Sequence, residues 1–305
     1  MAMTEDVIEK LEKAGAAVAQ ALERALDIVQ EGASIRKACQ DLENVVLKQG
    51  AKPAFPVNIS INEVAAHYTA PPTDDPLIPP RSVVKVDIGA HVDGYIADAA
   101  ITIALDPEHL PLVKAAYDAL KVALSTLKHG VSLRLVGAAV ERCILANGYV
   151  PIRNLTGHKI ERYNLHAGKS VPNVAVWSLA RAEEGEIYAV EPFVTDGEGV
   201  VVEGGYGNIF RIISTRRTGY RELDEFLRAL WKEYRSLPFA SRWVYAKWGL
   251  RGLEKLEELV RKKRIYHYPV LVERSKGLVS QFEDTVIVTR EGTKPLVGTL
   301  SIVKY

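Results

Sequence analysis

The chain has 305 residues, of which 48% are hydrophobic and 25% are charged, a composition typical of a globular protein. Its 39 basic and 38 acidic residues leave a formal net charge of +1, which excludes a bulk attraction to nucleic acid or to an anionic membrane. The two distant cysteines exclude a disulfide framework, and neither a secretory leader nor an apolar run of membrane-spanning length occurs. We therefore expect a soluble, cytoplasmic protein.

The first half of the chain is predicted to contain helices and one hairpin. Asp93-Gly94 is a strong hairpin-turn signal, and apolar, strand-like residues flank it at 83–88 and 95–104. Apolar residues at three- to four-residue spacing, together with N-cap and stop signals, indicate helices. These predicted helices span 4–31, 34–48, 109–128 and 132–147.

The second half is predicted to contain mainly short strands. Between them, the region at about 215–266 is rich in Arg, Lys, Glu, Leu and Trp with helical periodicity. We interpret it as a helical insertion within one catalytic domain of residues 1–305, in the α+β class. The predicted strands lie at 157–166, 186–194, 200–203, 207–213, 268–273, 279–289 and 298–303.

The hairpin places two carboxylates on one face. If Asp93-Gly94 is a two-residue turn, the numbers of facing residues sum to 187, and Asp98 lies opposite Gly89. Asp87 is two residues along on the same face, so the two carboxylates are diagonal neighbours ~7–8 Å apart. Gly89 would leave a space between them where a metal ion could sit.

Taken singly, these residues have simpler explanations. Aspartates near hairpins usually cap turns or face solvent, and a lone histidine is more often a hydrogen-bonded structural residue. However, Glu191 and Glu283 also lie in otherwise apolar strand-like segments, where an unpaired carboxylate is costly to bury. One such residue could belong to a buried ion pair. Four carboxylates and His158, all placed on strands, suit divalent ions with mixed oxygen and nitrogen ligands.

With these residues, the sequence resembles the methionine aminopeptidases of the pita-bread fold, which share their site with prolidases and creatinases. The insertion and the segment Leu237–Trp243 resemble the type 2, archaeal-like members. The implied fold has pseudo-symmetric antiparallel sheets backed by helices. The matching segments are Asn62–Thr69, Lys85–Gly89, Ile96–Asp98, Gly157-His158, His166–Lys169, Val190–Phe193 and Gln281–Glu283.

The resemblance implies removal of the initiator methionine with two divalent ions, Co²⁺, Mn²⁺, Fe²⁺ or Zn²⁺. Asp87 and Asp98 would bind one ion, and Asp98 and Glu283 would bridge to a second ion held also by His158 and Glu191. A water or hydroxide between the ions would be the nucleophile. Glu191 would also carry the proton to the leaving amine. Family members commonly have His where this chain has Asp284, beside the last ligand.

The resemblance assigns the remaining site residues to the substrate. His67 and His166 would contact the scissile peptide as catalytic residues. Phe55, Leu165 and Tyr268 align with the methionine pocket, although plain core packing explains them equally well. His91 matches no functional position, and we expect it to be exposed beside the hairpin turn.

Two other functions remain open. A prolidase-like dipeptidase shares all five ligands but normally has a sizeable N-terminal domain, for which this chain has no room. A non-catalytic interaction protein of the proliferation-associated type loses ligands that are present here. We expect a monomer acting on the N-terminal Met of peptides and nascent chains, with ribosome contact left open. Neither a membrane nor a specific nucleic acid is expected as a partner, because the basic helical face of 242–264 is interpreted as solvated.

Overall fold

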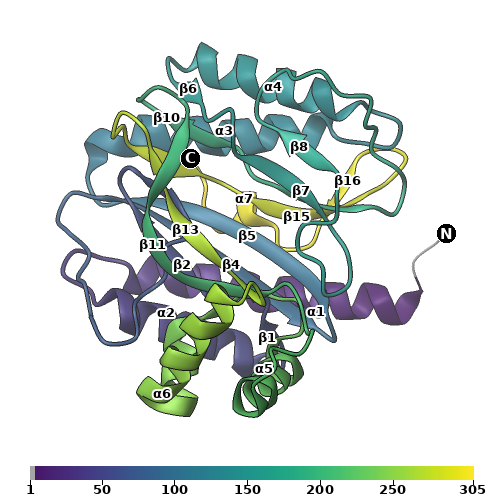
Figure 1. The fold of residues 1–305 in the computed structure, drawn as a ribbon. Helices are drawn as coiled ribbons and strands as arrows, with labels where there is room; N and C mark the ends of the chain where they lie inside the picture. Colours follow the sequence, from purple (N-terminus) through teal and green to yellow (C-terminus); the bar gives the residue numbers. More distant parts are fainter. Residues whose placement is uncertain (1–3) are drawn as a thin grey trace.

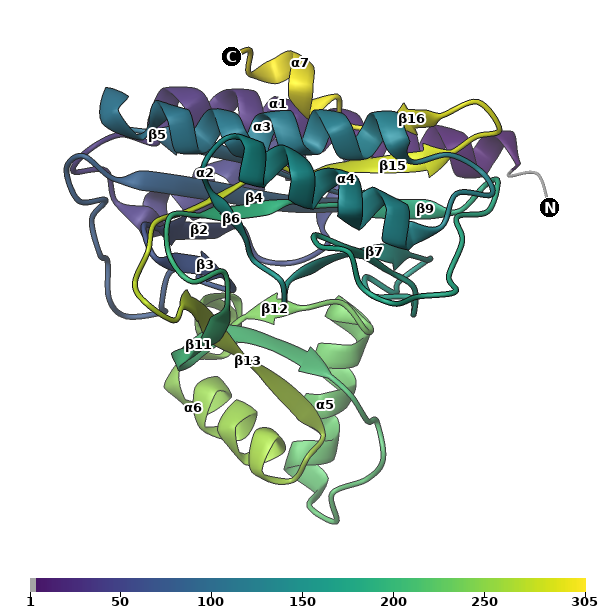
Figure 2. The ribbon, with the colours of Figure 1, turned by 90° about the horizontal axis from the view of Figure 1, so that it is seen from above.

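The computed structural model describes residues 4–305. Its helices pack mainly on one side of antiparallel sheets, and two further helices project from the opposite side (Figures 1 and 2). The α-helices are α1 (Glu5–Ile28), α2 (Ile35–Lys48), α3 (Leu110–Thr126), α4 (Leu133–Ala146), α5 (Arg221–Tyr234), α6 (Ser241–Arg261) and α7 (Thr299–Ile302), with a 3-10 turn at Pro107–His109.

Every strand pairing is antiparallel, in four small sheets. The first sheet contains β1 (Lys52–Pro53), β2 (Asn58–Ile61), β4 (Val83–Val92) and β5 (Tyr95–Ala104), and the second β6 (Val150–Pro151), β10 (Phe193–Thr195) and β14 (Val279–Gln281). The third contains β3 (Val64–Ala66), β11 (Val201–Ile212), β12 (Phe239–Ala240) and β13 (Ile265–Glu273). The fourth contains β7 (Thr156–Ile160), β8 (Ser170–Pro172), β9 (Ile187–Val190), β15 (Asp284–Val288) and β16 (Thr293–Pro295).

The main core lies between the helices and these sheets. Helix α1 presents a stripe of fully buried alanine, leucine and valine to β4 and β5, including Leu11, Val18 and Leu22. This spacing of three to four residues is the pattern from which the helix was predicted. The α+β architecture with antiparallel sheets backed by helices is therefore confirmed.

The hairpin has the predicted register. Asp93 and Gly94 both have positive φ, at 53° and 85°, as a two-residue turn of the type favoured in hairpins requires. The ladder of β4 and β5 runs without a register shift, and Gly89 pairs with Asp98. β4 is longer than the predicted segment 83–88, since it extends to Val92, whereas β5 has the predicted bounds. Asp87 and Asp98 therefore lie on one face, as expected.

His91 departs from the expectation of an exposed residue. It is 8% exposed, and its Nδ1 accepts a hydrogen bond from the backbone N–H of Gly94, 3.0 Å away. Its ring meets the Tyr163 ring edge-on at 5.6 Å. His91 is buried because the segment after β7, which contains Tyr163, covers the end of the hairpin. Its side chain stabilises the turn by accepting the Gly94 hydrogen bond.

Residues 299–302 form helix α7 where the sequence predicted a strand at 298–303. The buried carboxylate of Asp284 explains the difference. Its oxygens accept hydrogen bonds from the backbone amides of Val297, Gly298 and Thr299, at 3.2, 2.9 and 2.8 Å. These amides begin a helical turn, so the chain turns away from the sheet at this point.

Helices α5 and α6 lie between β11 and β13 in the sequence and form a small core of their own. Phe210 and Ile212 of β11 and Ile265 of β13 pack against leucines and aromatic residues of these helices. Figure 2 shows both helices on the far side of β11 and β13 from α1 and α3. Arg242 of α6 is not part of a solvated basic face as expected, because it is 5% exposed and paired with Glu43.

Candidate metal centre

The predicted site residues come together around one cavity of about 250 Å³. The cavity lies between the hairpin, the fourth sheet and the β11–β13 pair. Side chains that are up to 228 positions apart in sequence share its walls. The cavity is lined by all ten residues singled out from the sequence: Phe55, His67, Asp87, Asp98, His158, Leu165, His166, Glu191, Tyr268 and Glu283.

Two of the acidic residues sit at breaks in strands. Asp87, Asp98 and His158 lie within β4, β5 and β7, but Glu191 follows the end of β9 and Glu283 falls between β14 and β15. The prediction that all five lie on strands is therefore wrong for Glu191 and Glu283. Glu283 makes a single bridge to Ala100 of β5, and this bridge brings its carboxylate over the hairpin.

The donor atoms converge closely. One ligand atom each from Asp98, His158 and Glu283 lies within 4.8 Å of the others. The Nε2 atom of His158 is 3.8 Å from Asp98 Oδ2 and 3.6 Å from Glu191 Oε1. Asp87 lies beside this group on the shared face of the hairpin. The arrangement offers carboxylate oxygens and one imidazole nitrogen around a common space.

Burial leaves these carboxylates without a compensating positive charge. Burial raises the pKa of Asp87 to about 7. Burial, and then the charges of neighbouring carboxylates, raise the pKa values of Asp98, Glu191 and Glu283 well above the usual range. Burial also lowers the pKa of His158 to about 3, so its ring is neutral at physiological pH. In their ionised form, these carboxylates need a cation to balance their charge.

A divalent metal fits the residues present. Asp87 Oδ1 and Asp98 Oδ1 are buried and have no hydrogen-bond partner. Unsatisfied buried polar atoms are costly and usually mark a partner, here an ion, that completes the site. Neutral imidazole and carboxylate oxygen are the ligands that Zn²⁺, Mn²⁺, Fe²⁺ and Co²⁺ accept.

The space over Gly89 is filled differently from the expectation. A side chain at this position would collide with the Phe55 ring, which lies directly against the Gly89 backbone. The prediction that Gly89 leaves an empty space is therefore wrong, because the Phe55 ring fills it. The glycine allows an apolar ring to approach the hairpin between the two aspartates, so that Phe55 forms a wall next to the ligands.

Gln281 has a role that the sequence did not assign. Its Nε2 donates hydrogen bonds to Glu283 Oε2 at 3.1 Å and to Glu191 Oε2 at 3.3 Å. It is 1% exposed and is the side chain that orients both glutamates. Gln281 belongs to one of the matching segments, but only the folded chain shows that it contacts both strand-break residues.

His67 and His166 lie beside the ligand group without joining it. His67 follows β3 with a φ of 65°, and its Nδ1 lies 3.3 Å from the carbonyl oxygen of Pro269. Burial lowers its pKa to about 4, so the ring is neutral. The His166 ring is 4.3 Å from the His158 ring, in the irregular segment after β7 instead of on the predicted strand.

Asp284 points away from the cavity. Because residues alternate along a strand, the carboxylate beside Glu283 faces the opposite side, where it caps α7. The hydroxyl of Thr299 also donates to the backbone carbonyl of Glu283, at 2.7 Å. The departure from the family pattern thus leaves the ligand group unchanged and supports the backbone of its last member.

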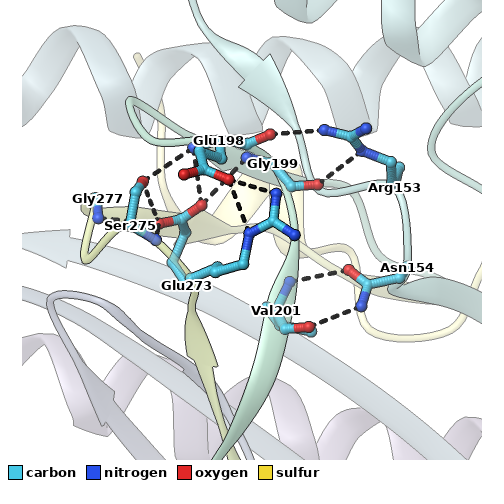
Figure 3. A network of polar contacts seen from close by, with 9 residues as sticks. Arg153, Asn154, Glu198, Gly199, Val201, Glu273, Ser275 and Gly277 are labelled. Carbon is cyan, nitrogen blue, oxygen red and sulfur yellow. Dashed lines mark hydrogen bonds and ion pairs between the residues drawn. The ribbon is translucent and has the colours of Figure 1, made fainter.

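A polar network fixes the opposite edge of the cavity (Figure 3). Asn154 lines the cavity and exchanges two hydrogen bonds with the backbone of Val201, at 2.8 and 2.9 Å. Glu273, which is fully buried at the end of β13, ties the loops next to it together. Its carboxylate accepts hydrogen bonds from the backbone amides of Glu198, Gly199, Ser275 and Gly277.

The sequence did not identify several wall residues. Asn58 lies opposite Asp87 on β2, and Phe193, Ile209 and Pro238 add apolar surface. Ile209 precedes the helical insertion in sequence, whereas Pro238 lies within it, between α5 and α6. Apolar strand residues of this kind look identical in sequence to core residues, so no signal marked them as cavity lining.

Residues 9–290 match metallopeptidase family M24. The chain is 41% identical to a methionine aminopeptidase of Saccharolobus solfataricus, an alignment that covers 98% of this chain and 100% of the relative. The family match covers most of this chain, and the relative is similar over its full length. Together they define the chain as a metallopeptidase. The chain belongs to metallopeptidase family M24.

Solved structures show the same fold. A methionine aminopeptidase from Thermotoga maritima superposes with a TM-score of 0.68 at 23% identity, covering 97% of this chain and 98% of that chain. A thermophilic Arx1 superposes with a TM-score of 0.85 at 18% identity, covering 100% and 95%. The pita-bread fold expected from the sequence is confirmed. The resemblance to archaeal type 2 methionine aminopeptidases is also confirmed, by the curated relatives.

Proposed function

We propose that this chain removes the initiator methionine from nascent proteins by hydrolysis of the first peptide bond. It is a metallo-exopeptidase of the methionyl aminopeptidase kind, in agreement with its curated archaeal relatives. The observation that carries the proposal is a group of four carboxylates, two buried and two half-buried, and one neutral histidine around a common space, with no cationic side chain among them.

Two divalent ions are proposed for the centre. Asp87 and Asp98 would hold one, and Asp98, His158, Glu191 and Glu283 would hold or share the other. The charges of four carboxylates are balanced by two such ions. When bound, the metal supplies Lewis-acid activation of water and of the scissile carbonyl. Co²⁺, Mn²⁺, Fe²⁺ and Zn²⁺ are the candidate ions.

The protein side chains supply proton transfer and orientation. The Glu191 carboxylate borders both the ligand group and the open cavity, so it can take a proton from water and pass it to the leaving amine. His67 and His166 are proposed catalytic residues that hydrogen-bond the scissile peptide through ring nitrogens facing the cavity. Gln281 keeps Glu191 and Glu283 oriented through its amide.

An apolar wall is proposed to bind the methionine side chain. Phe55, Leu165 and Tyr268 line the cavity beside the ligand group, and Phe193 and Ile209 extend this surface. A cavity of about 250 Å³ can hold one amino-acid side chain.

The proposal extends to the organisation of the chain and its surroundings. Residues 1–305 would form one catalytic domain with the type 2 insertion at about 215–266, acting as a monomer in the cytoplasm. Substrates would be peptides and nascent chains with an N-terminal Met. No helix within residues 4–305 is long and apolar enough to cross a membrane.

Purified protein tests the proposal directly. The metal is stripped with a chelator, each candidate ion is restored in turn, and release of free methionine from Met-Ala-Ser is measured beside cleavage of Ala-Pro. We expect metal-dependent cleavage of Met-Ala-Ser and up to two bound ions by elemental analysis. Cleavage of Ala-Pro alone would make it a prolidase-like dipeptidase. Protein that binds no ion and stays inert would be a non-catalytic interaction protein.

A further inference from the structure

One face of the β11–β13 pair continues the cavity wall outward. Ile209 of β11 faces Tyr268 of β13, and both line the cavity. The next pair on the same face is Arg211 and Tyr266. Because alternate residues of a strand share a face, Arg211 points to the cavity side. Phe210 and Ile212 take the opposite face and pack against the insertion.

Arg211 has no partner in the folded chain. Within residues 4–305 no hydrogen bond is made by its guanidinium, and no carboxylate lies within ion-pair distance. Its Nε is buried and unsatisfied. A half-buried guanidinium that lacks both a hydrogen bond and a countercharge is unfavourable, since a cation removed from water needs one or the other. The position suits an arginine that is completed by a bound anion.

The surroundings place this cation at the edge of the substrate cavity. Burial is the main cause that lowers the pKa of His166 to about 4, and the Arg211 charge lowers it further. Burial also raises the pKa of Tyr268, and the Arg211 charge opposes that shift. Beside Arg211, Tyr266 is 43% exposed and meets Tyr268 edge-on at 4.9 Å. The cation therefore lies between the substrate-facing residues and solvent.

We propose that Arg211 binds a carboxylate of the substrate downstream of the scissile bond. This inference rests on the proposed function. Successive same-face pairs of a sheet are ~7 Å apart, which is the length of two extended residues. A substrate that leaves the cavity along this face therefore brings its third or fourth residue to Arg211. The planar guanidinium can hold a carboxylate through two parallel hydrogen bonds.

The inference predicts a preference for acidic residues early in the nascent chain. An Asp or Glu side chain at the third or fourth residue, or the terminal carboxylate of a short peptide, offers the same group. Arg211 is in this sense a specificity-determining residue, since it contacts the substrate away from the reacting atoms. The surrounding site residues select the N-terminal methionine, and Arg211 adds discrimination among the chains that follow it.

Amidated peptides separate the two sources of carboxylate. The kcat/KM of the metal-loaded enzyme is measured on Met-Ala-Ala-Asp-amide against Met-Ala-Ala-Asn-amide, and on Met-Ala-Asp-Ala-amide against its Asn counterpart. Met-Ala-Ala with a free and an amidated C-terminus forms the third pair. We expect about a fivefold advantage for the acidic peptide in at least one pair, mainly in KM and reduced by salt. The pair that responds identifies the source.

Variants assign the preference to Arg211. In Arg211→Gln the acidic-to-neutral ratio should fall to about one, whereas Arg211→Lys should retain part of it because the charge remains. Arg134→Gln removes an exposed charge on α4, distant from the cavity, and should leave the ratio unchanged.

Wild-type ratios near one in all three pairs, or a ratio unchanged in Arg211→Gln, would overturn the inference. Failure of the wild type to cleave any neutral peptide would instead overturn the proposed function.

Discussion

The two kinds of histidine in the cavity differ in what their nitrogens face. His158 Nε2 points at the carboxylates of Asp98 and Glu191, whereas His67 Nδ1 lies near the Pro269 carbonyl and its ring meets the Tyr268 ring edge-on. The first arrangement suits a metal ligand and the second suits a substrate contact. Their substitutions should therefore have separable effects.

We predict that His158→Ala loses one metal ion and most activity, while His67→Ala keeps both ions. In His67→Ala, kcat on Met-Ala-Ser should fall by ~10²-fold, within the range for loss of one proton-transferring or hydrogen-bonding group. Metal content by elemental analysis and turnover with saturating metal provide the two measurements. Thermal unfolding confirms that both variants are folded.

The control is His109→Ala, since His109 is half-buried in the 3-10 turn Pro107–His109 and does not line the cavity. It should match the wild type in metal content and turnover. Unchanged turnover in His67→Ala would refute its catalytic role, and full metal content in His158→Ala would remove it from the ligand set.

The hairpin joins the ligand group to the substrate wall. Gly89 pairs with Asp98 and lies two residues from Asp87 on the same face of the hairpin. Because it has no side chain, the Phe55 ring packs directly against the strand. Phe55 is 6% exposed and packed among Ile96, Ile160 and Leu237, so the ring has little room to move. One glycine thus sets the position of both an apolar wall and the two carboxylates beside it.

We predict that Gly89→Ala raises KM for Met-Ala-Ser without removing the metal ions. The added methyl group displaces the Phe55 ring into the cavity, and overpacking of this kind typically costs ~1–3 kcal/mol of stability. Steady-state kinetics measure the rise in KM, elemental analysis measures the metal content, and the melting temperature measures the loss of stability. In a Phe55→Ala background, where the ring is absent, Gly89→Ala should cost little stability. If Gly89→Ala destabilises both backgrounds equally, the ring is not the source of the strain.

Some secondary-structure elements were predictable from the sequence, and others were not. The hairpin register was predictable because Asp93-Gly94 fixes a two-residue turn, and that turn fixes which residues face each other. The strand breaks at Glu191 and Glu283 were not predictable, because they depend on pairing with strands that are distant in the sequence. Helix α7 was missed for a similar reason. Its start depends on the Asp284 carboxylate, 15 residues before Thr299.

The site itself followed from residue chemistry more than from fold. Buried carboxylates in apolar segments stand out in a sequence, and His67 and His166 were selected through the resemblance. Gln281 and Ile209 did not stand out, because a buried amide and an apolar strand residue are common in any core. Their roles depend on which side chains the tertiary structure places beside them.

At the scale of the whole molecule, a buried ion pair ties the insertion to the catalytic core. Glu43 of α2 and Arg242 of α6 are 6% and 5% exposed, and Arg242 Nη1 lies 2.7 Å from Glu43 Oε2. Glu43 also accepts hydrogen bonds from Trp243 Nε1 at 3.0 Å and from the Val57 backbone at 3.1 Å. One carboxylate thereby connects the N-terminal helices, the segment leading into β2, and the insertion.

Removing one partner of such a pair leaves the other charge buried and unpaired, which destabilises proteins by ~3–5 kcal/mol. We predict a loss of this order for Glu43→Gln, measured by chemical unfolding. Val57 and Trp243 donate to different oxygens of Glu43, and glutamine keeps only one of them, so the loss includes one hydrogen bond as well as the charge. In an Arg242→Met background the same substitution should cost little, because it removes a carboxylate that is already unpaired. An equal loss in both backgrounds would mean that the pair does not couple the insertion to the core. In that case the packing of Phe210 and Ile212 against α5 and α6 would alone hold the two parts together.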